Sequence, residues 1–64
     1  MIDLEARVFE LLNNAVENGH EGSIPRDNTE CANELQDNGL QDFTVDQLMP
    51  FIVRWKTARG KYKQ

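Results

Sequence analysis

His20 and Cys31 are the side chains of this chain best suited to acid–base or nucleophilic chemistry. A catalytic histidine needs a partner that holds it in a cleft, and a nucleophilic cysteine needs a base close to it. His20 lies between two residues, Gly19 and Glu21, that supply neither. Cys31 falls on the apolar side of a predicted helix, where a thiol behaves as a small hydrophobic residue. We therefore expect the protein not to be an enzyme.

The sequence also lacks the ligand patterns of common metal sites. One cysteine and one histidine cannot provide the usual nitrogen and sulfur ligands of a zinc site. The carboxylates Asp37, Asp42 and Asp46 lie close together in sequence but lack the ligand spacing of an EF-hand, which also requires a closing glutamate. We interpret these residues as caps, turns and a solvated helix face. No metal or cofactor is predicted.

Charge is strongly segregated along the chain. All eleven acidic residues lie between Asp3 and Asp46, whereas the stretch from Pro50 to Gln64 contains no acid and five basic residues, Arg54, Lys56, Arg59, Lys61 and Lys63. Segregated charge can orient a binding partner. It also has a structural interpretation, because basic side chains near the end of a helix complement its negative pole and their stems cover apolar surface while the charged heads stay in water.

Aromatic residues accompany the basic segment. Phe51 and Trp55 are four residues apart, on one side of a predicted helix, with basic residues beside them. Exposed tryptophan next to arginine is typical of interface hot spots. The sequence thus indicates a partner-binding surface made of Phe51, Arg54, Trp55, Arg59 and Lys61. The alternative is that Trp55 fills the core of the domain.

The elements that must position these residues are three helices, at about 3–18, 29–37 and 44–59. The first follows from an apolar face with helical spacing, Leu4, Val8, Leu11, Leu12, Ala15 and Val16. In the second, Cys31, Ala32 and Leu35 are expected to point inward. Together the helices predict an all-α, compact three-helix domain over residues 1–60, followed by a short basic tail at 61–64.

The third helix has the clearest local signal. Thr44 and Gln47 have the spacing of a capping box, in which each side chain bonds the other residue's backbone. Pro50 interrupts the same helix. Because proline lacks an N–H and its ring clashes with the carbonyl four residues earlier, we expect the helix to be kinked or split there.

Length and composition set the class of protein. A chain of 64 residues forms at most one domain, and such a domain has little room to enclose a substrate. A single cysteine excludes an internal disulfide, the first residues lack the pattern of a signal peptide, and no apolar run approaches the length of a membrane span. These features predict a small protein in the cytoplasm, and its formal net charge of −4 makes it acidic.

The most consistent function is that of a regulatory or accessory protein that acts by protein–protein interaction, as monomer or homodimer. Small phage inhibitors and regulators are proteins of this type. The alternative is a nucleic-acid binder, because residues 29–60 resemble a helix-turn-helix pattern and the basic C-terminal end could contact phosphates. Asp46, in the first turn of the third helix, argues against recognition of DNA bases by that helix, because nearby phosphates would repel its carboxylate.

A third interpretation is that the acidic surface mimics DNA.

Overall fold

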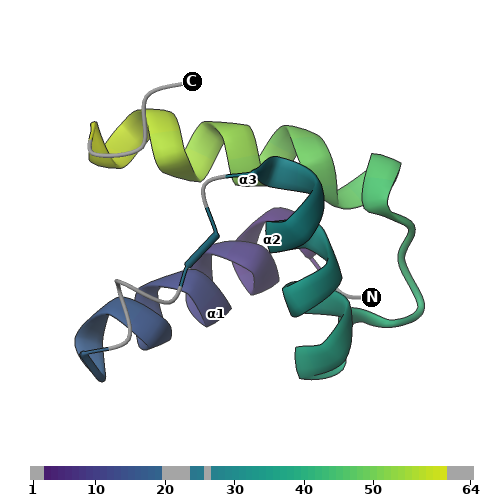
Figure 1. Cartoon of the computed structure of the whole chain (residues 1–64), viewed down its shortest axis with the longest axis horizontal. Helices are drawn as coiled ribbons and strands as arrows, with labels where there is room; N and C mark the ends of the chain where they lie inside the picture. The colour runs from purple at the N-terminus through teal and green to yellow at the C-terminus, as the bar shows by residue number, and fades with distance from the viewer. Residues whose placement is uncertain (1–2, 20–23, 26, 61–64) are drawn as a thin grey trace.

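The computed structural model describes residues 3–19, 24–25 and 27–60. Three α-helices form this part of the chain: α1 (Leu4–Glu17), α2 (Asn28–Leu35) and α3 (Val45–Arg59). A short π-helical segment, η2 (Gln36–Leu40), continues from α2. In Figure 1, α3 runs along one side of the molecule, and α1 and α2 lie against it. The predicted all-α three-helix architecture is confirmed.

Side-chain caps fix the starts of α1 and α3. The Asp3 carboxylate accepts a hydrogen bond from the backbone N–H of Ala6, at 3.2 Å. At the start of α3, the Thr44 hydroxyl accepts from the Gln47 N–H at 3.1 Å, and the Gln47 side chain accepts from the Thr44 N–H at 2.8 Å. The predicted capping box is therefore present. Gly60 ends α3 in the left-handed conformation, with φ of 75°, which is accessible to glycine without steric cost.

The second helix begins and ends slightly earlier than predicted. Its cap is Asp27, whose carboxylate accepts from the Thr29 N–H at 2.8 Å. The α-helical pattern stops at Leu35, and the wider η2 turn follows. Within η2, Gly39 has φ of 116°, so the chain reverses at a residue without a side chain to clash.

The predicted kink or split at Pro50 is not confirmed. α3 is one helix from Val45 to Arg59 and includes Pro50 as its sixth residue. Pro50 removes one hydrogen bond of the second turn, but its ring is exposed and the capping box already holds the preceding turn.

α3 organises the core because it contacts both other helices, whereas α1 and α2 make few contacts with each other. Two of its apolar side chains, Leu48 and Ile52, are completely buried. The inward prediction for α2 is confirmed. The buried apolar residues are Val8, Leu12, Ile24, Cys31, Ala32, Leu35, Leu40, Leu48, Ile52 and Trp55.

Among the residues placed by the structure, no helix is long and apolar enough to cross a membrane.

Candidate functional site

Trp55 lies in the core, with only 2 % of its surface exposed. Its indole N–H donates a hydrogen bond of 2.8 Å to the Asn13 side-chain oxygen on α1. A buried indole needs such an acceptor. Trp55 therefore fills space in the core with its ring and connects α3 to α1 through its hydrogen bond. The core interpretation of Trp55 is the one observed. Trp55 therefore packs inside the domain, and its ring is not part of the exposed surface.

Phe51 and Arg54 do lie at the surface. Phe51 is half-buried, and the Arg54 guanidinium lies 5.7 Å from the centre of its ring, within the range of a cation–π contact. The same guanidinium donates a hydrogen bond of 2.8 Å to the Glu5 carboxylate on α1. The Arg54 and Glu5 side chains are 63 % and 44 % exposed, so water screens this ion pair and its contribution to stability is small.

Arg59 covers the outer side of the tryptophan. Its guanidinium lies 5.3 Å from the centre of the Trp55 ring, and its side chain is half-buried. Arg59 thus lies between the core and the solvent. Lys61, the last member of the predicted surface, lies outside the described residues.

Lys56 departs from the prediction that basic side chains of the last segment keep their heads in water. It is only 1 % exposed, and its ammonium donates a hydrogen bond of 2.7 Å to the backbone carbonyl of Pro25. This hydrogen bond ties the segment before α2 to α3. This basic residue belongs to the fold.

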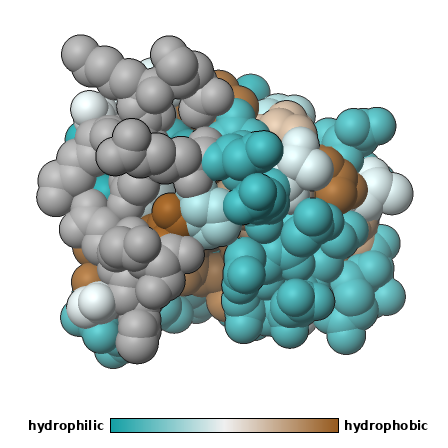
Figure 2. Space-filling view, viewed as in Figure 1, coloured by the Kyte–Doolittle hydropathy of each residue, from teal (hydrophilic) through white to brown (hydrophobic). Residues whose placement is uncertain are grey.

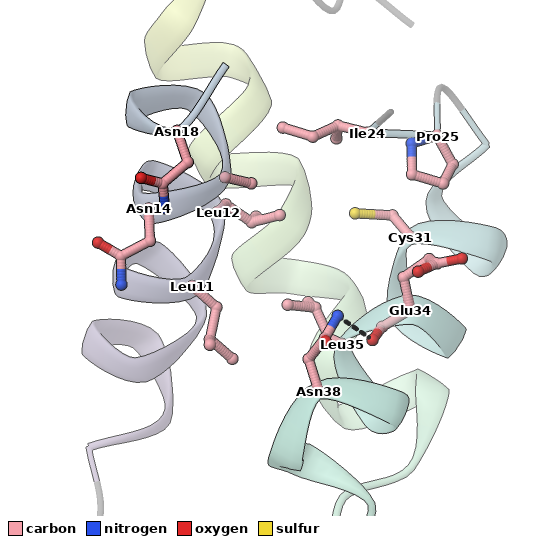
Figure 3. A pocket seen from close by; sticks show the side chains of 11 residues that line it. Leu11, Leu12, Asn14, Asn18, Ile24, Pro25, Cys31, Glu34, Leu35 and Asn38 are labelled. Carbon is pink, nitrogen blue, oxygen red and sulfur yellow. Dashed lines mark hydrogen bonds between the residues drawn. The ribbon is translucent and has the colours of Figure 1, made fainter. Parts of the chain in front are cut away.

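A half-open groove lies between α1 and α2 (Figure 3). Its volume is about 410 Å³, which is within the usual range of ligand pockets. The groove exists because α1 and α2 scarcely contact each other and are held apart by α3 behind them. Apolar side chains line most of it: Leu11, Leu12, Ala15, Ile24, Pro25, Cys31 and Leu35. Amides and one carboxylate complete the lining: Asn14, Asn18, Glu34 and Asn38.

Cys31 directs its sulfur toward α1 across this groove (Figure 3). Burial raises the pKa of the Cys31 thiol above its ordinary value of 9.0, Lys56 acts in the opposite direction, and Glu34 raises it further. The thiol is therefore protonated at neutral pH. A protonated, buried thiol is a poor nucleophile, so it contributes an apolar wall to the groove.

Acidic residues follow the α2 side of the groove. Glu34 lines the groove, and Glu30 and Asp37 lie four residues before it and three after it, on the same exposed stripe. The sequence from Asp27 to Val53 contains six acidic residues and no lysine, arginine or histidine. Figure 2 shows the corresponding hydrophilic surface over α2, with apolar surface next to it. The groove thus combines an apolar interior with an acidic rim.

Sequence reasoning missed this groove. The groove residues Leu11, Leu12 and Ala15 of α1 were correctly predicted to lie on an apolar face. That face is wider than the surface that α3 covers. The signal available was the pair Leu11 and Ala15, which extends the apolar side of α1 beyond its fully buried members, Val8 and Leu12.

Within the parts of the chain that are described, no cluster of three or more histidine, cysteine or acidic side chains could hold a metal ion. His20 lies outside those parts. No protein-family model matches this sequence, and comparisons with curated proteins and with solved structures also find no match.

Proposed function

We propose that this chain is a small non-enzymatic regulatory or accessory protein that acts by binding another protein. The observation that carries the proposal is the apolar groove of about 410 Å³ between α1 and α2. A domain of 64 residues buries only about 60 % of the surface that its unfolded chain exposes. Leaving apolar surface in a groove costs such a domain stability, and a bound partner recovers that stability by covering the groove.

The chemistry of the groove supports binding over catalysis. Its polar groups are three asparagine amides and the Glu34 carboxylate, and its thiol, Cys31, has a raised pKa. Such groups orient a ligand through hydrogen bonds and charge. A hydrolytic or transfer reaction would instead call for an activated nucleophile with a base beside it.

We also propose a second contact surface on α3, made of Phe51, Arg54 and Arg59, with Trp55 packed inside the domain. Lys61, which follows α3 in sequence, belongs to this surface by sequence prediction alone. Phe51 and Arg54 support it by combining half-exposed aromatic surface with an exposed guanidinium. We place the protein in the cytoplasm, as monomer or homodimer.

The test is affinity capture from lysate of the source cell or its host, followed by binding measurements with the purified partner. Three variants divide the surfaces: Ala15→Phe fills the groove, the double variant Arg54→Glu/Arg59→Glu reverses charge on α3, and Thr57→Ala is an exposed control. We expect one partner to bind wild-type protein and Thr57→Ala equally, and to lose at least about tenfold in affinity with a groove or an α3 variant. A partner that binds all variants equally would contradict the proposal.

The nucleic-acid alternative is tested by titrating duplex DNA at low and at physiological salt. The exposed residues in the first turns of α3 are Asp46, Gln47 and Pro50, and Arg54 pairs with Glu5, so we expect no specific binding. Binding that weakens steeply with salt and disappears in Arg54→Glu/Arg59→Glu would favour the alternative.

A further inference from the structure

The groove lies between two helices that a third helix holds apart. α1 and α2 stand on either side of it, and α3 lies behind (Figure 3). Helices pack by placing the side-chain ridges of one into the grooves of its neighbours. A fourth helix lying between α1 and α2 would therefore extend the three-helix domain toward a four-helix arrangement. The volume of about 410 Å³ accommodates side chains from one face of such a helix, with its backbone outside the groove.

The rim specifies the charge of the occupant. On α2, Glu30, Glu34 and Asp37 form an exposed acidic stripe, and on α1 the exposed Glu17 lies three residues beyond Asn14, which lines the groove. Among the residues that the structure describes, no lysine or arginine lines the groove.

The basic residues that the structure describes are engaged elsewhere. Arg7 pairs with Glu10, Arg54 pairs with Glu5, and Arg59 stacks on the Trp55 ring. Lys56 lies closest to the groove, because its ammonium donates to the carbonyl of Pro25, which lines the groove, but Lys56 itself is buried and does not line it. A partner with positive charge therefore meets an acidic rim.

We propose that the groove binds a cationic amphipathic helix of a partner protein. Apolar side chains at positions i, i+3, i+4 and i+7 of that helix insert between Leu11 and Leu35, and flanking lysine or arginine side chains face Glu34 and its acidic neighbours. Anchors at this spacing are the general way in which a helix is read by an apolar groove. The inference names the partner class of the proposed protein-binding function and rests on it.

A synthetic peptide tests the inference with the full chain. The probe is a dye-labelled amphipathic peptide of about 18 residues, with leucine at the helical spacing and lysine elsewhere. This length exceeds the minimum of about 12–15 residues below which isolated helices are marginally stable. A second peptide replaces every lysine with glutamate, and a third scrambles the order. We expect the lysine peptide to bind at least about tenfold more tightly than either control, and its affinity to fall with added salt.

Matched variants locate the binding. Glu34→Lys changes the rim, and its exposed side chain makes the substitution compatible with the fold because Asn38 bonds only the Glu34 backbone. Asp42→Lys makes the same charge change in the exposed turn before α3. We expect Glu34→Lys and Ala15→Phe each to weaken peptide binding about tenfold, and Asp42→Lys to leave it within about twofold. Circular dichroism of each variant checks that it is folded.

Cys31 gives an independent readout that needs no substitution. It is the chain's single cysteine, it lines the groove and it is only 1 % exposed, so an alkylating reagent reaches it only when the domain opens. Saturating peptide should slow this alkylation, because binding stabilises the closed domain. Equal effects of Glu34→Lys and Asp42→Lys, or alkylation unchanged by bound peptide, would overturn the inference. So would a homodimer that Ala15→Phe dissociates, because a second copy would then occupy the groove.

The two proposals fail separately. A captured protein partner that depends on the α3 surface, together with no binding of the lysine peptide, would overturn the helix inference and leave the protein-binding function standing. Capture of no protein partner by the wild-type chain would overturn the function itself.

Discussion

Three buried residues illustrate how individual side chains serve the fold. Trp55, Lys56 and Cys31 are all nearly inaccessible to solvent, although one carries a charge and another a titratable thiol. The tryptophan N–H and the lysine ammonium each donate to an oxygen of another segment, as buried donors generally must. The thiol stays neutral because burial raises its pKa.

At the residue scale, the state of Cys31 predicts how stability depends on pH. Its pKa in the folded protein lies above the ordinary value of 9.0, so above that pH the unfolded chain loses the thiol proton more readily than the folded one. The free energy of unfolding should therefore fall as pH rises beyond about 9, by up to about 1.4 kcal/mol per pH unit from this group. Urea denaturation between pH 7 and about 10 measures the fall.

Cys31→Ala is the control for this prediction, because it keeps every other titrating group. The variant should show a smaller decrease over the same pH range. Parallel curves for the two proteins would mean that the thiol is not the cause.

At the element scale, α3 contains a capping box that stabilises its start and a proline that disfavours helix in its second turn. The Thr44 capping box fixes its first turn, while Pro50 leaves the helix without one hydrogen bond in the next. The helix continues through the proline to Arg59, because burial of Leu48, Ile52 and Trp55 on both sides of it outweighs a local penalty of about 3 kcal/mol.

Pro50→Ala should therefore stabilise the protein. The substitution restores the backbone bond and removes the ring, and part of the gain is offset because alanine gives the unfolded chain more freedom, at about 0.4–1 kcal/mol. We expect a net gain of about 2 kcal/mol in the free energy of unfolding, measured by urea denaturation. Thr57→Ala, at an exposed position of the same helix, should change stability by less than about 0.5 kcal/mol. A loss of stability in Pro50→Ala would show that the proline is favourable where it stands.

At the scale of the whole molecule, α3 joins two helices that scarcely contact each other. Ile52 is completely buried on it, and Ile52→Ala should cost about 2–5 kcal/mol. A domain of 64 residues has a total stability of only about 3–10 kcal/mol. We expect the variant to lose a large share of this stability and to unfold at a lower urea concentration than the wild type, with Trp55 fluorescence and far-ultraviolet circular dichroism changing together.

Val53→Ala is the matched control, since Val53 is next in sequence and only half-buried. It should cost clearly less than Ile52→Ala. Separate transitions for fluorescence and circular dichroism would contradict the view that α3 makes the domain a single cooperative unit.

The same scales explain what the sequence could predict. Caps and apolar faces depend on residues three or four apart, so Asp3, Thr44 and the inward side of α2 were predictable from spacing alone. The burial of Lys56 depends on Pro25, which is 31 residues away in sequence, and no local pattern contains that pairing. The groove is harder still to predict, because it results from contacts that α1 and α2 do not make.

The central position of α3 also has a consequence for synthesis on the ribosome. Translation proceeds from α1 toward α3, so the helix that both others need is made last of the three. At about 5–20 residues per second, the 15 residues of α3 take about one to three seconds to add. During that time the nascent chain contains the apolar faces of α1 and α2 without the helix that covers them in the folded domain.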